Sequence, residues 1–172
     1  MKKIRSLLFV YCLILIVSCN KTNDDIQLPP LESEFLVFLQ GQLSAELKTI
    51  TGEVDTDYEV FPLVHASIIG KSVNGDTTLS IALNDDDENL FPFKNNGIFN
   101  VGGTSINASV TLVQGNTTTI ANTGSVTITQ FERTDNASND FIKLSGTFVV
   151  SDGTLSISGT FTNIILPCGE CE

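Results

Sequence analysis

Short runs in which hydrophobic and polar residues alternate fill the chain from residue 33 onward, and no stretch there has the spacing of an amphipathic helix. The runs are rich in Val, Ile, Thr and Phe, which favour strands, and turn residues separate them. The pattern predicts strands over residues 35–39, 42–47, 65–69, 77–83, 105–113, 117–121, 124–131, 141–150 and 154–165. Two-residue turns are predicted at Gln40-Gly41, Asn74-Gly75, Gly115-Asn116 and Asp152-Gly153.

The last predicted hairpin has the clearest pattern. A two-residue turn would pair its apolar positions as Val150 with Leu155, Phe148 with Ile157, Gly146 with Gly159 and Leu144 with Phe161. The other face would carry the polar side chains of Lys143, Ser145, Thr147, Ser156, Ser158 and Thr160. Two facing glycines leave a gap for a ligand or for a neighbouring aromatic ring, and strand glycines more often serve packing and curvature.

These elements predict a mainly β fold, a single antiparallel β-sandwich or partly open β-barrel built from hairpins, with about nine or ten strands. A chain of 172 residues suits one such domain, which we place at residues 33–167. Residues 168–172 form a C-terminal tail.

Residues 1–18 have the organisation of a bacterial lipoprotein signal peptide, which is cleaved from the mature protein. Basic residues precede an apolar run over residues 7–17, which is too short to span a bilayer. The run ends in Ile16-Val17-Ser18-Cys19, which resembles a lipobox and makes Cys19 the predicted lipidation site. Several acyl chains, palmitate among them, would give a durable anchor. The alternative is an ordinary secretory signal in which Cys19 is incidental.

Residues 19–32 are predicted to be the lipidated cysteine and a flexible tether, because they are polar and contain Pro29-Pro30. Asn20 is not the Asp that retains lipoproteins in the inner membrane of enterobacteria. The Lys- and Asp-containing stretch that follows resembles the surface-export signal of Bacteroidota lipoproteins. These features predict a protein of the cell envelope, lipid-anchored in the outer membrane and facing either the periplasm or the cell surface.

Three segments carry a resemblance to a known family. Residues 124–131 read GSVTITQF, residues 144–148 read LSGTF and residues 155–164 read LSISGTFTNI. In this order they resemble the C-terminal half of a family of small Bacteroidota lipoproteins of uncharacterised function. That family combines a lipobox leader with an all-β domain ending in a G-x-F-x-N-I strand, and residues 38–42 resemble its opening hairpin. The resemblance implies the anchor and the fold and brings no catalytic residues.

The charge balance excludes one class of partner. The chain has 20 acidic and 9 basic residues, a net charge of −11. Without Lys2, Lys3 and Arg5 of the leader, six basic residues remain and the net charge becomes −14. Such a surface repels phosphate backbones, so nucleic acid is not an expected partner.

Enzymatic motifs are missing from the sequence. His65 is the single histidine and lies in an apolar run, where a strand residue is the simplest interpretation. No Gly-x-Ser-x-Gly motif supplies a nucleophile, and Gly102-Gly103-Thr104 lacks the GK[ST] of a phosphate loop. We therefore expect no catalytic residue and no cofactor.

A run of four carboxylates is the one candidate for a metal. The side chains of Asp85, Asp86, Asp87 and Glu88 offer hard oxygen ligands that suit a weak Ca²⁺ site. The run lacks the alternating spacing of a calcium loop, and a solvated acidic loop is the alternative that we favour.

Cys168 and Cys171 lie in a C-x-x-C arrangement close to the C-terminus. No βαβ pattern surrounds them, so a redox motif is not indicated. In an oxidising periplasm a local disulfide is expected, with little effect on stability because it closes a very short loop.

Two classes of function remain open. The first is a non-catalytic β domain that binds a protein or glycan through its loops or an open sheet face. The second is a small glycosidase-like hydrolase that uses two carboxylates. The lack of a catalytic constellation favours the first.

Overall fold

Ten strands make up the part of the chain that the structure describes. The computed structural model describes residues 32–57, 63–85, 97–103, 107–134 and 141–167. The chain divides into two units, Met1–Leu31 and Glu32–Glu172, and every described strand belongs to the second. The strands are β1 (Glu34–Leu39), β2 (Gln42–Asp57), β3 (Leu63–Ser72), β4 (Thr77–Asp85), β5 (Gly97–Val101), β6 (Ala108–Gln114), β7 (Thr117–Ile120), β8 (Thr123–Thr134), β9 (Phe141–Ser151) and β10 (Ser156–Pro167).

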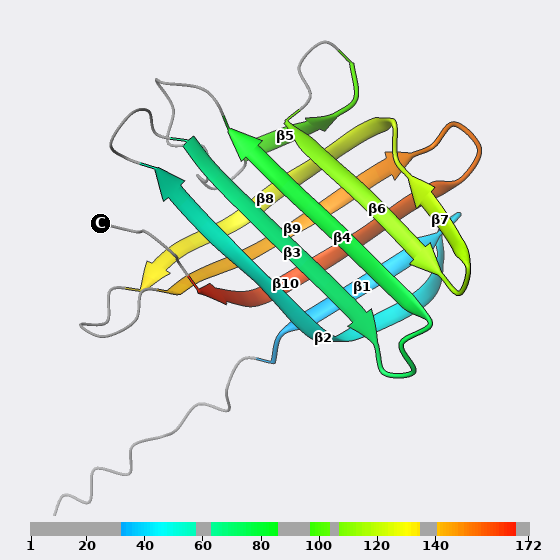
Figure 1. Cartoon of the computed structure of the whole chain (residues 1–172), viewed down its shortest axis with the longest axis horizontal. Coiled ribbons are helices and arrows are strands. Elements are labelled where there is room, and N and C mark those ends of the chain that lie inside the picture. The colour runs from blue at the N-terminus through cyan, green and yellow to red at the C-terminus, as the bar shows by residue number, and fades with distance from the viewer. Residues whose placement is uncertain (1–31, 58–62, 86–96, 104–106, 135–140, 168–172) are drawn as a thin grey trace, which may run out of the picture. The chain divides into compact units, whose positions relative to one another are not determined.

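The strands form one sheet in the order β4-β3-β2-β1-β10-β9-β8-β5-β6-β7. Because β4 also pairs with β6, the hydrogen-bonded neighbours form a ring. All ladders are antiparallel except the single parallel bridge between Val101 and Ala108. Figure 1 shows two layers whose strands cross: β3, β4 and β6 in front, with β8, β9 and β10 behind. The mainly β fold predicted from the sequence is confirmed, with an arrangement consistent with either a sandwich or an open barrel.

The two ends of the strands differ in their connections (Figure 1). Tight turns join β1 to β2, β3 to β4, β6 to β7 and β9 to β10 at one end, which we call the turn end. The first residue of β1 and the last residue of β10 lie at the opposite end, which we call the terminal end. The antiparallel pairing places the last residues of β2, β4 and β8 at the terminal end as well.

Three of the four predicted turns have the expected register. Leu39 pairs with Gln42 and Gln114 pairs with Thr117, so two residues make each of those turns. At Gln40-Gly41 both residues have positive φ, 50° and 81°, the conformation that joins two antiparallel strands with the correct twist. The β3–β4 register is centred on Asn74-Gly75 as predicted. However, β3 ends at Ser72 and β4 begins at Thr77, each one residue farther from the centre than in a two-residue turn.

The predicted register of the last hairpin is wrong by two residues. Phe148 pairs with Gly159, and Gly146 pairs with Phe161, so the two glycines do not face each other. The cause is the side chain of Asp152, whose Oδ1 accepts hydrogen bonds from the backbone N–H groups of Thr154 and Leu155, both at 2.7 Å. These two hydrogen bonds hold the pKa of Asp152 below its usual range, and the bond from Leu155 has the larger effect. A shift by two residues leaves the side chains of β9, and those of β10 as far as Phe161, on the faces that the sequence predicts.

Each of these glycines lies under the phenylalanine of its partner strand. A Cβ at Gly146 would lie 2.8 Å from Cε2 of Phe161, and one at Gly159 would lie 2.5 Å from Cε1 of Phe148. Phe35 of β1 packs edge-on against both rings, with centroid distances of 6.3 Å to Phe148 and 5.9 Å to Phe161. Aromatic rings therefore fill the space above the glycines, which leaves no slot for a ligand there.

The sequence predicts only residues 42–47 of strand β2, less than half of its length. The strand spans 16 residues, pairs with β1 through residues 42–46 and with β3 through residues 47–57. Register shifts in both ladders bend it between the two layers. Strand β5 was not predicted at all.

The core between the layers contains the fully buried aromatic rings of Phe35, Phe99, Phe148 and Phe161. Aliphatic side chains from other strands complete it.

Candidate functional site

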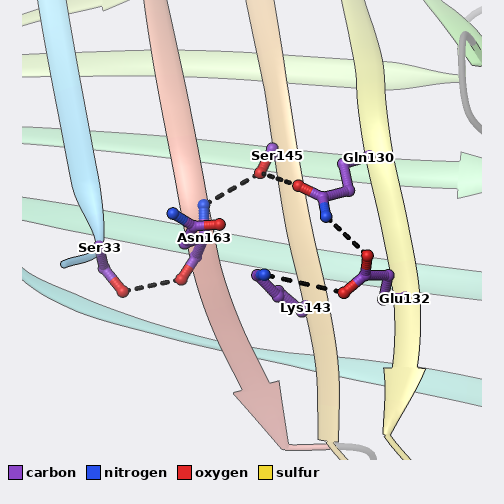
Figure 2. Close-up of polar contacts among 6 residues, drawn as sticks. All are labelled: Ser33, Gln130, Glu132, Lys143, Ser145 and Asn163. Atoms are coloured by element: carbon purple, nitrogen blue, oxygen red, sulfur yellow. Dashed lines mark hydrogen bonds and ion pairs between the residues drawn. The ribbon is translucent and has the colours of Figure 1, made fainter. Parts of the chain in front are cut away.

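A cluster of polar side chains lies where two β-bulges flank β9 (Figure 2). The β8–β9 register shifts between Ile128 and Gln130, and the β10–β9 register shifts between Phe161 and Ile164. In the second bulge Asn163 has a positive φ of 53°, a conformation that Asn tolerates better than most residues. Asn163 is also the Asn of the G-x-F-x-N-I segment, so that motif corresponds to a bulge.

Ser145 is the centre of this cluster. Its Oγ accepts a hydrogen bond from the backbone N–H of Asn163 at 3.0 Å and donates to Oε1 of Gln130 at 3.3 Å. Gln130 Nε2 in turn donates to Glu132 Oε1 at 2.7 Å, and Lys143 Nζ lies 3.7 Å from Glu132 Oε2. Figure 2 shows the chain of contacts running across β8, β9 and β10.

The cluster also fixes the start of the domain. The Ser33 hydroxyl donates a hydrogen bond to the backbone carbonyl oxygen of Asn163 at 2.8 Å. This contact joins the residue just before β1 to the bulge of β10 (Figure 2). The chain therefore enters the domain at a defined point beside β10.

Ser145 differs from its predicted environment. The sequence places it on the exposed polar face, yet it is 6% exposed. It does lie on the outer face of β9, but the bulges bring Asn163 and Gln130 over it. Its oxygen donates one hydrogen bond and accepts another, and neither partner is a base. The arrangement is that of a structural hydroxyl, not of an activated nucleophile.

Replacing Ser145 with Ala should lower the free energy of unfolding by about 1–3 kcal/mol, because the buried N–H of Asn163 loses its acceptor. The matched control is Thr147→Ala, two residues along the same face of β9 and exposed, where a loss of about 0.5 kcal/mol or less is expected. Urea denaturation monitored by circular dichroism measures both. Equal losses would contradict a structural role for the Ser145 hydroxyl.

His65 lies in strand β3, as the sequence predicts, and its side chain is exposed. Its Nδ1 lies 2.7 Å from Oδ1 of Asn84, the residue opposite it on β4. The partner of the imidazole is thus a side-chain amide and not a hydroxyl or thiol that it could activate.

Most of the other predicted sites lie outside the described residues. These are Cys19, Cys168, Cys171, Asp86, Asp87 and Glu88, while Asp85 is described only as the last backbone position of β4. Within residues 32–57, 63–85, 97–103, 107–134 and 141–167, no group of three or more His, Cys, Asp or Glu side chains is arranged to hold a metal. The calcium site and the disulfide stay predictions.

A second feature, which the sequence did not predict, lies on the outer face of the layer containing β9. Two neighbouring rows of outward side chains cross this layer, and within them the one ionisable group is Glu46, at the β2 end of the second row. One row, from β5 to β2, is Asn100, Ser125, Val149, Ser158, Phe38 and Leu43. The other, from β5 to β1, is Ile98, Thr127, Thr147, Thr160 and Leu36. We call these eleven residues the neutral face.

The neutral face combines hydroxyl groups with exposed aliphatic side chains. Ile98, Val149 and Leu43 are 62%, 61% and 60% exposed. They lie on β5, β9 and β2, so other strands of the layer separate each from the next. The signal in the sequence was the Thr and Ser alternation, but only the strand order shows that residues from six strands line up.

Comparison with known protein families, with curated proteins and with solved structures gave no match to this chain. Among the residues whose placement the structure gives, no helix has the length and apolar character needed to cross a bilayer.

Proposed function

We propose that this protein is a lipid-anchored, non-catalytic binding domain of a bacterial cell envelope, held in the outer membrane through Cys19. The order of basic segment, apolar run and lipobox supports the anchor. The polar tether and the resemblance to small Bacteroidota lipoproteins agree with it.

The neutral face is the observation that carries the binding function. In a chain with a net charge of −11, the eleven residues of this face include no ionisable side chain, and Glu46 borders the face at the end of its second row. Its mixture of hydroxyl groups and exposed aliphatic side chains suits a partner surface that is also uncharged. We infer that the partner is a protein, because the single ring of the face is the half-buried Phe38 and sugar binding usually relies on exposed rings.

The position of the tether is compatible with such a role. The chain enters the domain at the terminal end, and the 13 residues from 20 to 32 can extend to about 45 Å. A tether of that reach lets the domain turn its side, where the neutral face lies, toward a neighbouring protein.

Photo-crosslinking in intact cells tests this proposal. A photoreactive amino acid at Val149 should give a crosslinked protein adduct of defined mass. The matched control is Ile120, which is also aliphatic and 64% exposed but lies on β7 of the other layer. A photoreactive amino acid at Thr147 should give the same adduct while Val149 is unchanged. The adduct should disappear when Val149 is replaced with Asp.

Several outcomes would contradict the proposal. Equal adducts at Val149 and Ile120, or none at Val149, would exclude the neutral face as the binding surface. A heterogeneous carbohydrate adduct would replace the protein partner with a glycan. Turnover of glycosides or esters that is lost on replacing one carboxylate would support the hydrolase alternative instead.

A further inference from the structure

The turn between β3 and β4 contains an Asn-Gly pair, the dipeptide most prone to spontaneous deamidation. In that reaction the backbone nitrogen of the glycine loses its proton and attacks Cγ of the asparagine. A C–N bond forms, ammonia leaves from Cγ, and water then opens the cyclic imide to aspartate or isoaspartate. Glycine favours the step because it has no side chain to hinder the attack.

The side chain of Asn74 is fixed by three hydrogen bonds. Its Oδ1 accepts from the Ser72 hydroxyl at 2.7 Å and from the backbone N–H of Asp76 at 3.2 Å. Its Nδ2 donates to Oδ2 of Asp76 at 2.8 Å. Both ends of the amide are therefore occupied, although the residue is exposed.

The attacking nitrogen is occupied as well. The backbone N–H of Gly75 donates to the carbonyl oxygen of Ser72 at 2.9 Å, and Gly75 has a φ of 76°. Ser72 is itself held, since its Oγ accepts from the backbone N–H of Thr77 at 3.0 Å. Cyclisation requires the amide of Asn74 to rotate and the Gly75 nitrogen to lose its proton, so it must break most of these bonds.

We propose that this turn protects Asn74 from deamidation, and that Ser72 and Asp76 are the residues that provide the protection. Deamidation would place a second carboxylate beside Asp76, and isoaspartate would add a methylene group to the backbone of the turn. Either product disturbs the hairpin whose register the turn sets. The inference does not depend on the proposed function.

Peptide mapping by mass spectrometry tests the proposal on the chain without its leader, residues 20–172, aged at mildly alkaline pH. Asn74 should deamidate at least about tenfold more slowly in the folded protein than in denaturant, since several hydrogen bonds oppose the reaction. Ser72→Ala and Asp76→Ala should each raise the rate in the folded protein about fivefold, the factor expected for one hydrogen bond of ordinary strength. Ser80→Ala, a serine of β4 away from the turn, is the matched control and should leave the rate unchanged.

The second Asn-Gly pair of the chain, Asn96-Gly97, serves as an internal reference in the same digest. In the Ser72→Ala and Asp76→Ala variants, faster deamidation of Asn74 with an unchanged rate at Asn96 supports local protection by the turn. Equal rates in folded and denatured protein would overturn the proposal. A rise at both sites in the Ser72→Ala and Asp76→Ala variants would also overturn it, because it would show general loosening of the fold.

Discussion

A Gly146→Val substitution should lower the free energy of unfolding by about 3 kcal/mol, at the upper end of the range for overpacked cores. The new Cβ would lie 2.5 Å from the carbonyl oxygen of Thr127 and 2.8 Å from Cε2 of Phe161. The phenylalanine ring can move only by displacing Phe35, which packs against it. The carbonyl belongs to the ladder between β8 and β9, so it cannot move without breaking strand pairing.

Gly159→Val should have a similar effect for the same reason on the neighbouring strand. Its Cβ would meet the carbonyl oxygen of Leu36 and the ring of Phe148. Thr147→Val is the control, because it places valine beside Gly146 on the exposed face by exchanging only a hydroxyl for a methyl group, and the expected change is about 0.5 kcal/mol or less. Urea denaturation gives all three values. A loss at Thr147 equal to that at Gly146 would show that the two faces of β9 have been exchanged.

A Cys19→Ser substitution should abolish labelling of the protein by a palmitate analogue and move it from the membrane fraction to the soluble fraction. The proposed anchor needs the Cys19 thiol to accept the diacylglycerol group, and serine does not replace it. Acyl chains contribute about 0.8 kcal/mol for each buried methylene group, so loss of all of them removes essentially the whole membrane affinity.

Cys12→Ser is the matched control for that experiment. Cys12 lies inside the apolar run of the leader and no small residue precedes it, so its replacement should leave labelling intact. Labelling that persists in Cys19→Ser, or that depends on Cys12, would refute the lipobox. A secreted, unlabelled wild-type protein would support the ordinary secretory signal.

Features that depend on neighbouring residues were predictable from the sequence. The turns at Gln40-Gly41 and Gly115-Asn116 follow from which residues adopt positive φ, and the alternation of Val126 and Ile128 with polar neighbours identifies the buried face of β8. These preferences act within a few residues, so one strand and its turn contain the whole signal.

Features that depend on long-range packing were not predictable. The β9–β10 register follows from the side chain of Asp152, which enlarges the turn by capping two N–H groups. The pairing of β4 with β6 joins strands that are not adjacent in sequence, and no local pattern encodes it. The same limit applies to the two candidate surfaces. Burial of Ser145 requires bulges on both sides of β9, and the neutral face exists only once six strands are in order.

The central position of β1 has a mechanical consequence. It is hydrogen-bonded on both sides, through six residue pairs to β10 and four to β2, and the proposed tether pulls on its first residue. A force between the membrane and the turn end of the domain would load both ladders in shear, so that many hydrogen bonds resist together. A force between the two ends of the chain would instead peel β1 from β10 one pair at a time, beginning at Glu34 and Thr162. The domain should therefore resist rupture far better when pulled between its first residue and its turn end than between its own termini.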